Sequence, residues 1–508
     1  MPSAMLKSTR YLSTSILHNN AVRRSRKKIS LISDEDKEKL RQATNKDLKV
    51  PEKQLSSQAN EKKVPTNRIQ RQMTFAPLIT NLAGVAVGKL VKNSIPAALK
   101  PGSSNNKKNP DGTDIVSQLL PDSTTELLVN TLSRARGAAL KIAQVISIQD
   151  DNVVPKHIVQ LFDRVRESAD YMPFTQIESQ MNKQFGQNWR DIFQNFEEKP
   201  FAAASIGQVH RAIVDGQEVA VKIQYPGVAQ SIDSDVKNLK MVLPLLNLPE
   251  SLFPETAIDM AREELHDEVN YLREAECQEE MRNYFSEDPV IKIPKVVSSG
   301  SSSEILSTEY ISNSINIDKC VELDQETRNF IARHLIRVCL EQLFTLRFMQ
   351  TDPNWGNYMW SGSTGQIIML DFGATRRYDK SFIDTYIKII NAAVYNDSDT
   401  IKTESIKIGF LTGYEAPEMI KAHVDSVLIL GEFLRAKEPY DFKTQHISRR
   451  IAKDQIPEMV KGRLTAPPKE TYSIHRALAG VFLAATKLDA QIVSNDLWLD
   501  VYEKYEFD

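Results

Sequence analysis

The feature that most constrains this chain is a set of three polar residues at fixed spacing, Asp352, Asn357 and Asp371. The first two lie in the segment Thr351-Asp-Pro-Asn-Trp-Gly-Asn357, and the third directly follows the β-rich run Gln366–Leu370. An Asp, an Asn five residues later and a strand ending in Asp-Phe-Gly match the catalytic loop and metal-binding turn of phosphoryl-transfer enzymes. Carboxylate and amide oxygens suit Mg²⁺. The pattern predicts Asn357 and Asp371 as magnesium ligands and Asp352 as the catalytic residue.

A second feature lies upstream, where two β-rich runs meet at Asp215-Gly216, which is typical of a hairpin turn. The second run ends in Val219-Ala-Val-Lys222, and a strand of this kind supplies the Lys that contacts nucleotide phosphates. The loop before the hairpin is not glycine-rich. Because alanine does not adopt positive φ as glycine does, this loop is predicted to cover the phosphates in a stiffer way. Its nucleotide-contacting residues are Ala202, Ala203, Ala204 and Ser205.

These elements occur in the order that a kinase-like chain requires, so we predict an α+β, two-lobed protein-kinase-like fold with a helical N-terminal extension packed on the N-lobe. The adenine is expected to meet the hinge backbone at Glu309, Tyr310, Ile311 and Ser312. The segment Ala416-Pro-Glu418 resembles the end of an activation segment, but it lies 45 residues after Asp371 and is interpreted as a coincidence. Apolar periodicity predicts helices over 330–349, 382–396, 400–410, 417–435 and 472–488.

Composition excludes several classes of protein. With 41% hydrophobic and 26% charged residues, the chain is neither collagen-like nor wholly disordered. A formal net charge of -2 argues against a nucleic-acid partner, because such proteins usually carry a basic domain. Cys277, Cys320 and Cys339 are far apart and do not have the close spacing of zinc ligands, which favours a reducing compartment without structural disulfides.

The N-terminal region is predicted to carry targeting information. Residues 1–33 contain seven Lys and Arg but no Asp or Glu, which is typical of a mitochondrial transit peptide, with a disordered basic tail as the alternative. Residues 34–70 are predicted to be a disordered linker. An apolar run near 75–92 is too short for an ordinary bilayer span. It is either a membrane-contacting helix, which Gly84 and Gly88 would let dimerise, or an ordinary buried helix.

The predicted organisation has five segments, and the second contains the apolar run just described. They are a transit peptide (1–33), a linker (34–113), a helical extension (114–185), a kinase-like N-lobe (186–312) and a helical C-lobe (313–508). Within the extension, Lys141 lies in an apolar helical stretch, and lysine is rarely buried without a partner. From the residues alone, its side chain either reaches solvent, which is the favoured interpretation, or meets a carboxylate.

On these residues the chain resembles the UbiB family of atypical kinase-like proteins, over roughly residues 115–505. The resemblance rests on the Ala-rich loop, the TDPNWGN loop, and a helix on which Lys141 and Gln144 match the family's K-x-G-Q motif. It implies that this helix lies across the active site, where a protein kinase would hold its peptide substrate. It also implies that Glu274 is the carboxylate partner of Lys222.

The same resemblance implies that an E-x-D motif holds Lys141, and the corresponding residues here are Glu268-Val-Asn270. Two residues depart from the family pattern, because Ala143 replaces the Gly of K-x-G-Q and Asn270 replaces the Asp of E-x-D. Glu268 is therefore the ionic partner expected for Lys141. The departures affect the regulatory contact more than the nucleotide site, whose polar residues are intact.

The resemblance implies an ATP- and Mg²⁺-dependent atypical kinase or ATPase that supports coenzyme Q (ubiquinone) biosynthesis in mitochondria. The expected location is the matrix side of the inner membrane, with peripheral attachment. Expected partners are coenzyme Q biosynthesis proteins, the membrane surface and lipid precursors, with a homodimer through Gly84 and Gly88 and no nucleic acid. Two alternatives remain, a nucleotide-binding scaffold of the biosynthetic complex and a protein kinase acting in trans.

Overall fold

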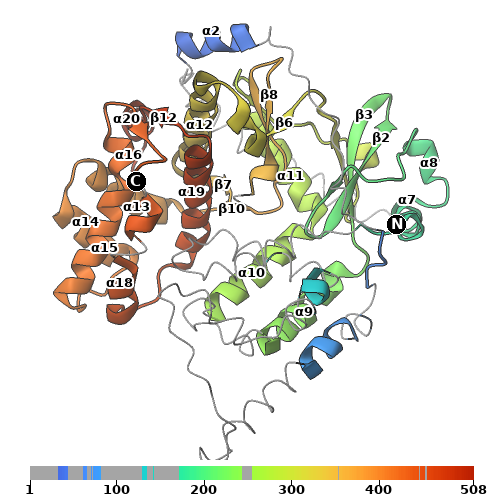
Figure 1. Ribbon diagram of the computed structural model, residues 1–508, viewed down its shortest axis with the longest axis horizontal. Coiled ribbons are helices and arrows are strands. Elements are labelled where there is room, and N and C mark those ends of the chain that lie inside the picture. Colours follow the sequence, from blue (N-terminus) through green and yellow to red (C-terminus); the bar gives the residue numbers. More distant parts are fainter. Residues whose placement is uncertain are drawn as a thin grey trace, which may run out of the picture.

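The computed structural model has two lobes, a smaller one built on an antiparallel sheet and a larger helical one (Figure 1). Each lobe has its own large hydrophobic core. This arrangement confirms the predicted two-lobed α+β fold. The structure describes residues 33–43, 61–65, 70, 73–81, 127, 129–133, 141, 171–242, 255–352, 354–445, 447–451 and 455–508.

The N-lobe sheet has the strand order β1-β2-β3-β5, with every neighbouring pair antiparallel. Its hairpin turns at Asp215 and Gly216, whose φ values of 50° and 78° are both left-handed, as a tight two-residue turn between twisted strands requires. The predicted Asp-Gly hairpin is thus confirmed. The strands are β1 (Ala202–Ala203), β2 (Gly207–Val214), β3 (Gln217–Gln224) and β5 (Ile305–Glu309).

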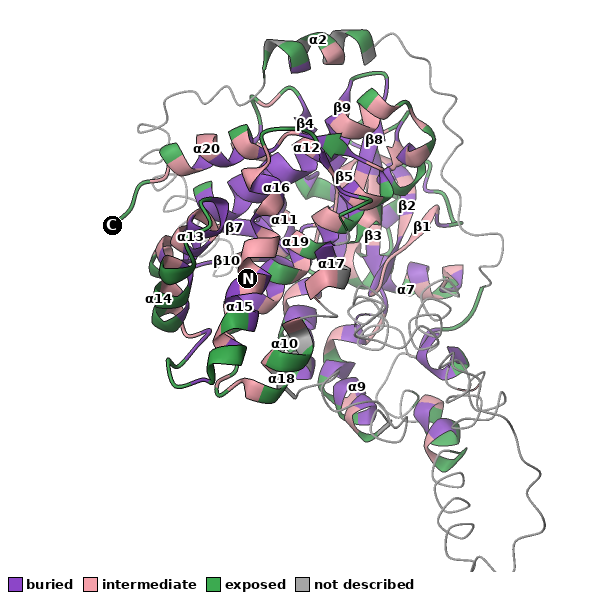
Figure 2. Ribbon diagram, turned by 60° about the vertical axis from the view of Figure 1, so that its left-hand side comes forward, coloured by how far each residue is buried: buried purple, intermediate pink, exposed green. Residues whose placement is uncertain are grey.

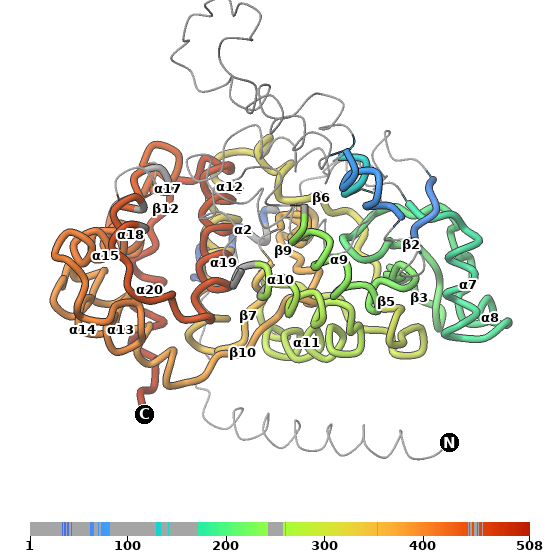
Figure 3. The backbone as a smooth tube through the Cα atoms, turned by 90° about the horizontal axis from the view of Figure 1, so that it is seen from below, coloured from blue at the N-terminus to red at the C-terminus, as the bar shows by residue number. Residues whose placement is uncertain are grey.

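Helices cover this sheet and bury its apolar residues, among them Val221 and Ile223 of β3, which are fully buried. Trp189 of α8 and Phe193, which follows it, pack into the same core. Figures 1 and 3 both place α10 between the two lobes. The helices of this half are α7 (Phe174–Phe185), α8 (Trp189–Ile192), α9 (Val228–Val242), α10 (Glu255–Glu268) and α11 (Tyr271–Tyr284).

The C-lobe is a helical body in which α12 and α19 pack side by side, and Figure 2 shows how much of both is buried. From Phe330 to Leu340 every residue of α12 except Arg333 is buried, and the Asp324 side chain caps the first turn of the helix by accepting from Thr327 N–H. The helices are α12 (Gln325–Leu340), α13 (Lys380–Val394), α14 (Ser398–Ile408), α15 (Pro417–Leu430), α16 (Glu432–Arg435), α17 (Ile447–Arg450), α18 (Ile456–Gly462), α19 (Lys469–Lys487) and α20 (Asn495–Glu503).

Short strands carry the catalytic segment between these helices. A four-stranded sheet has the order β4-β9-β8-β6, and two two-stranded sheets pair β7 with β10 and β11 with β12. The strands are β4 (Ile291–Lys292), β6 (Ile315–Asn316), β7 (Phe348–Gln350), β8 (Tyr358–Ser361), β9 (Gln366–Met369), β10 (Thr375–Arg377), β11 (Tyr440–Asp441) and β12 (Gln491–Ile492). The intervening helical turns are η5 (Ser298–Gly300), η6 (Ile317–Glu322), η7 (Glu341–Thr345) and η8 (Trp355–Asn357).

One helix prediction is wrong at its C-terminal end. The apolar period over 330–349 continues past the helix, which ends at Leu340 and passes into the π-turn η7. Arg347 then has a left-handed φ of 52°, which breaks the helical path and turns the chain into β7. The last apolar residues of the predicted helix therefore pair with β10 as a strand. Pro417 begins α15, so the Ala-Pro-Glu sequence is a helix start.

The N-terminal predictions need correction where the structure describes them. Within the predicted disordered linker, residues Asp34–Ala43 form the helix α2, and the backbone of Lys62 donates to the Tyr171 carbonyl at 2.9 Å. The helix starts because Ser33 and Asp36 exchange hydrogen bonds of a capping type. The prediction of disorder missed this, since the segment has little apolar periodicity.

The predicted membrane-contacting run is described only as far as Asn81, and that part is helical. Phe75 and Leu78 are fully buried in the N-lobe core, so this part follows the alternative interpretation of an ordinary buried helix. Gly84 and Gly88 lie outside the described residues. Among the helices that the structure describes, none combines the length and the hydropathy that a bilayer crossing demands.

Candidate active site

Three predicted residues converge on one buried ion cluster between the lobes. Lys222 of β3 places its Nζ 2.7 Å from Oε1 of Glu274 on α11 and 3.0 Å from Oδ2 of Asp371, which follows β9. Glu274 is buried, and burial raises the pKa of its carboxyl to about 7, although Lys222 opposes the shift. Burial also acts on Asp371, but Lys222 and the N–H of Gly373 outweigh it and hold the pKa of Asp371 below its usual value.

The Asp-Phe-Gly turn leaves no spare room around this cluster. The N–H of Gly373 donates to Oδ1 of Asp371 at 3.0 Å. A Cβ on Gly373 would lie 3.3 Å from carboxylate oxygens of both Asp371 and Glu274, which is tighter than ordinary contact. Arg273 donates to the Gly373 carbonyl at 2.9 Å, so α11 also fixes the backbone of the turn.

The two predicted metal ligands lie at one edge of the small sheet. Asn357 precedes β8 and Asp371 follows β9, and the antiparallel pairing of Tyr358 with Met369 brings these strand ends together. The N–H of Leu370 donates to the Asn357 carbonyl at 2.9 Å. Asn357 is nine-tenths buried, and its Nδ2 has no hydrogen-bond partner among the described residues. An amide oxygen and a carboxylate at one edge form a donor set that suits Mg²⁺.

The catalytic loop is held by its own side chains and by the metal-binding turn. Oδ1 of Asp352 accepts from the N–H of Asn354 at 3.1 Å, and the Asn354 side chain accepts from Gly356 N–H at 3.1 Å. Thr351 donates through its hydroxyl to the Ala374 carbonyl at 2.7 Å, so the residue before Asp352 is tied to the residue after the Asp-Phe-Gly turn. The two loops therefore keep a fixed relation.

Lys141 is buried and paired, so the favoured interpretation that it reaches solvent is wrong. Its side chain is 2% exposed and donates to Oε1 of Glu268. Its Nζ also lies 3.9 Å from Oδ2 of Asp352. Burial lowers the pKa of Lys141, but the carboxylates of Glu268 and Asp352 outweigh burial and hold it above its usual value. Lys141 thus places a cation beside Asp352, the predicted catalytic residue.

Asn270 has a structural role that differs from the one implied by the E-x-D motif, which is to hold Lys141. It caps α11, where its side chain accepts from the N–H of Arg273 at 3.2 Å. Lys141 is held instead by Glu268, and its ammonium lies 3.9 Å from the Asp352 carboxylate. Asn and Asp are equally good caps, so the departure from the family residue preserves this local structure. Gln144 and Ala143 lie outside the described residues.

Two further residues of the site could not be recognised from the sequence. Arg476 of α19 donates to Oε1 of Glu264 on α10 at 2.6 Å and to the Thr351 carbonyl at 3.2 Å. Glu264 is 1% exposed and lies one helical turn before Glu268. This contact ties the interlobe helix and the catalytic loop to the C-lobe. Glu264 was hidden in a run of acidic residues, and Arg476 in an otherwise ordinary amphipathic helix.

The Ala-rich loop and the predicted hinge face each other at the N-lobe rim. β1 pairs through Ala202 and Ala203 with β2, and the N–H of Ala204 donates to the Gly207 carbonyl at 2.8 Å. The ring of Phe201 meets the ring of Tyr310 edge-on at 5.7 Å between centroids. β5 ends at Glu309, and Tyr310, Ile311 and Ser312 follow it toward the C-lobe, while Ser205 completes the loop.

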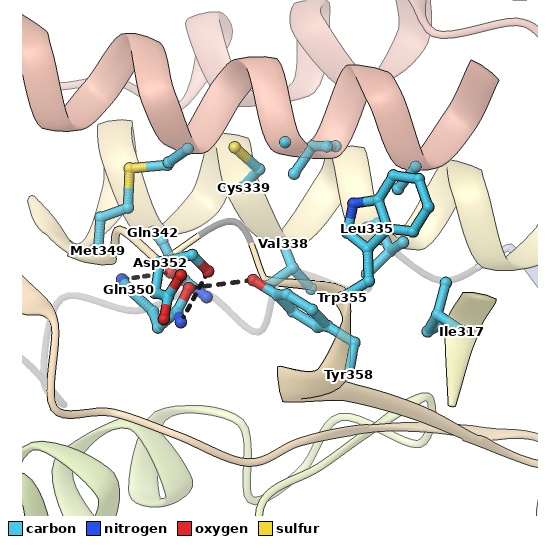
Figure 4. Close-up of a pocket in the computed structure, with 14 residues that line it drawn as sticks. Ile317, Leu335, Val338, Cys339, Gln342, Met349, Gln350, Asp352, Trp355 and Tyr358 are labelled. Carbon is cyan, nitrogen blue, oxygen red and sulfur yellow. Dashed lines mark hydrogen bonds between the residues drawn. The ribbon is translucent and has the colours of Figure 1, made fainter. Parts of the chain in front are cut away.

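A small cavity of about 20 Å³ lies behind the catalytic loop, between α12 and α19. Figure 4 shows Gln350 and Asp352 at one end and Trp355 toward the other. Tyr358 donates to Oε1 of Gln350 at 3.2 Å, and Gln350 donates to the Asp352 carbonyl at 3.0 Å. These bonds support the loop from its rear side. The lining residues are Ile317, Leu335, Val338, Cys339, Gln342, Met349, Gln350, Asp352, Trp355, Tyr358, Ala477, Gly480, Val481 and Ala484.

Comparisons with known proteins show the family of this chain. The model of the ABC1 atypical kinase-like domain matches residues 164–405. A Danio rerio protein named atypical kinase COQ8B, mitochondrial, is 41% identical over 480 residues, which cover 94% of this chain and 75% of that protein. The chain belongs to the ABC1 (UbiB) family of atypical kinases. The resemblance inferred from the motifs is thereby confirmed.

Other members of the ABC1 family are similarly close. A Saccharomyces cerevisiae protein named atypical kinase COQ8, mitochondrial, is 40% identical over 86% of this chain and 85% of its own length. The Rattus norvegicus protein named atypical kinase COQ8B, mitochondrial, is 42% identical over 90% of this chain and 84% of its own length. Among solved structures, the Rv3197–erythromycin complex from Mycobacterium tuberculosis aligns with 76% of this chain at a TM-score of 0.49 and 22% identity.

Proposed function

We propose that this ABC1 kinase binds Mg-ATP between its lobes and transfers or hydrolyses the γ-phosphoryl group in support of coenzyme Q biosynthesis. The observation that carries the proposal is the convergence of Lys222, Glu274 and Asp371, at 2.7 and 3.0 Å, from three separate elements. An ion cluster of this kind places a cation where phosphates lie and a carboxylate where a metal lies. The coenzyme Q pathway is inferred from the relatives, which are named atypical kinases COQ8B and COQ8.

The roles of the residues follow from position. Lys222 orients the phosphates while Glu274 holds its ammonium, and Asn357 and Asp371 are the residues that would hold Mg²⁺. When bound, this ion neutralises phosphate charge. Ala202, Ala203, Ala204 and Ser205 cover the phosphates, and Glu309, Tyr310, Ile311 and Ser312 present hinge backbone to the adenine. Asp352 accepts a hydrogen bond from the attacking hydroxyl or water.

Two observations disfavour a protein kinase acting in trans. The Lys141 ammonium lies 3.9 Å from the carboxylate of Asp352, the group that an acceptor would have to reach. Only six residues separate Gly373 from Lys380, the first residue of α13, which leaves little chain for an activation segment. A scaffold without chemistry is disfavoured because the polar set is complete. A scaffolding role alongside catalysis is compatible with every contact described.

The cellular setting is part of the proposal. Residues 1–33 have transit-peptide composition, and the relatives' names include the word mitochondrial. We place the protein at the matrix side of the inner membrane, peripherally attached, with coenzyme Q biosynthesis proteins and lipid precursors as partners. A homodimer through Gly84 and Gly88 belongs to the same proposal.

The test is ATP turnover by the purified chain with γ-labelled ATP, with and without membranes and lipid precursors, following where the label goes. Asp371→Asn removes one proposed ligand, so Mg-ATP affinity should fall roughly 100-fold, which is about 2.7 kcal/mol. Asp399→Asn, on the exposed start of α14, is the matched control. Retention of both Mg-ATP affinity and complementation of a quinone-deficient strain by Asp371→Asn would contradict the proposal.

A further inference from the structure

The helix α2 docks on the C-lobe although the chain next to it belongs to the N-lobe. Figure 1 shows α2 at the upper edge of the molecule, and the contacts of Asp36 with His334 and of Lys39 with Glu326 place it against α12. Downstream, Val64 is 4% exposed in the N-lobe core and exchanges two hydrogen bonds with the Gln176 side chain, at 2.9 and 3.0 Å. A ten-residue helix is marginal in isolation, so contacts with α12 are what hold α2 in place.

Asp36 is the residue through which α2 docks. Its side chain is 7% exposed, whereas Glu35 on the same helix is 77% exposed. Oδ2 of Asp36 lies 3.7 Å from Nε2 of His334 on α12. A buried carboxylate is costly unless a partner compensates it. Burial raises the pKa of Asp36, but His334 outweighs burial and holds it below its usual value. At the rim, Lys39 lies 3.6 Å from Glu326.

His334 also contacts a buried arginine, Arg337. Its Nδ1 accepts from Nε of Arg337 at 3.0 Å, which assigns the ring proton to Nε2, the nitrogen that faces Asp36. Nε2 has no hydrogen bond to any described residue, so the carboxylate of Asp36 is the acceptor aimed at it. Burial lowers the pKa of His334 to about 4, and the ring is therefore neutral. A carboxylate opposite a neutral imidazole fixes its tautomer and orientation.

Arg337 connects this pair to the segment before the catalytic loop. It donates to Glu341 at 3.1 Å and to Asp288 at 2.7 Å. Glu341 is the first residue of η7, a π-turn, and such turns often mark functional sites. The next residue, Gln342, accepts from the N–H of Gln350 at 2.9 Å. Gln350 in turn donates to the carbonyl of the catalytic-loop Asp at 3.0 Å.

From this chain of contacts we infer that Asp36 is a positioning residue for Asp352. Docked α2 fixes His334, which orients Arg337, and the arginine anchors η7 and through it the catalytic loop. The inference rests on the proposed phosphoryl-transfer function. Because Lys222 and Glu274 belong to β3 and α11 of the N-lobe, we expect the effect to fall on turnover and to leave nucleotide binding nearly unchanged.

The experiment compares full-length Asp36→Asn with Gln42→Ala, which changes an exposed side chain of the same helix. Asp36→Asn should lower kcat by about 3- to 10-fold with the KM for Mg-ATP within about twofold, the size of effect that remote coupling produces. Asp36→Glu, which keeps the carboxylate, should restore part of the loss. Gln42→Ala should match the wild type in both constants.

Hydrogen exchange at α2 and at residues 341–352 gives an independent readout. Both regions should exchange faster in Asp36→Asn. Lys39→Glu removes the contact with Glu326 without altering a buried group. It replaces Asp36→Asn as the test if that variant folds poorly, and it should also lower kcat. Unchanged kcat in a variant whose α2 exchanges faster would overturn the inference, as would unchanged protection of α2 in Asp36→Asn. Absence of turnover in every variant and in the wild type would instead count against the proposed function, while exchange at 341–352 would still decide the inference.

Discussion

The ammonium of Lys141 lies 3.9 Å from the Asp352 carboxylate, although the two residues are more than two hundred positions apart in the chain. Glu268 holds the same ammonium from α10. Lys141 therefore lies beside the predicted catalytic residue. The acceptor must share this space with a fixed positive charge, which favours a small molecule or water over a peptide.

Replacing Lys141 with Ala should open the site and leave Glu268 buried without its partner. Loss of one member of a buried pair lowers the free energy of unfolding by about 3–5 kcal/mol. In addition, the γ-phosphoryl group should reach acceptors that the wild type excludes, including the protein itself. Denaturant unfolding and γ-label transfer measure the two effects. A double-mutant cycle with Glu268→Gln should give a coupling energy of about 0.5–3 kcal/mol. Lys183→Ala, at an exposed lysine, is the control. A coupling energy near zero between Lys141 and Glu268 would show that their contact is unimportant.

Replacing Asp352 with Asn should separate binding from chemistry. The amide keeps the shape of the side chain but is a poor proton acceptor, so turnover should fall by about 10²–10⁴-fold, as for loss of a general base. Mg-ATP affinity should remain within a few-fold, since Lys222, Asn357 and Asp371 are intact. Single-turnover kinetics and equilibrium binding provide the measurements. Turnover equal to that of the wild type would move the chemistry to another residue.

Nucleotide binding should depend on pH through Glu274. Burial raises the pKa of its carboxyl to about 7, so below that pH the group carries a proton and no longer pairs with Lys222. Mg-ATP affinity should therefore rise as pH increases through about 7. Glu274→Gln should bind Mg-ATP weakly at every pH. The measurement is the ratio of the dissociation constants of the two proteins as a function of pH, because this ratio cancels the titration of the nucleotide itself.

Stability should depend on the same group in the opposite direction. The folded pKa of about 7 exceeds the ordinary carboxyl value of 4.5, so the folded state binds the proton more tightly. The contribution of protonated Glu274 is full below pH 4.5 and is lost as pH rises through about 7. The difference in unfolding free energy between Glu274→Gln and the wild type should therefore change between pH 4.5 and about pH 7. A pH-independent difference would show that Glu274 is ionised throughout.

Replacing Ala203 with Gly should loosen the loop over the phosphates, because glycine permits positive φ. We expect an altered preference among nucleotides and gained autophosphorylation, with no improvement in complementation. Binding of ATP and ADP, together with γ-label on the protein, provides the measurement. Ala212→Gly, farther along β2, is the control for lost strand stability. Identical nucleotide preference in both variants would argue against a role for the loop.

Replacing Arg476 with Lys should weaken the connection between α10 and the catalytic loop. A lysine cannot donate both to Glu264 and to the Thr351 carbonyl in the fork geometry of a guanidinium. Turnover should fall by about tenfold, and a cycle with Glu264→Gln should show a coupling energy above about 1 kcal/mol. Arg190→Lys, at an exposed pair, is the control. Additive effects of the two substitutions would exclude the connection.

The sequence by itself determined the order of the elements and the chemistry of the nucleotide site. Strand-ending motifs work at short range, because the residue that ends a strand lies at the sheet edge whatever packs around it. The Asp-Gly hairpin, Lys222 and the Asp-Phe-Gly turn were therefore predictable. The partner of Lys222 required the family resemblance, since helical spacing alone spreads the acidic residues of 263–280 around their axis.

Only the tertiary structure decided which distant charges meet. Burial of Lys141, the contact of Arg476 with Glu264 and the docking of Asp36 on His334 join segments that no periodicity relates. The helix α2 looked like solvated linker because a charged helix that buries one carboxylate has no apolar period to reveal it. Such contacts depend on how lobes and extension pack together, since the desolvation of a charge is set by everything around it and by nothing in its local sequence.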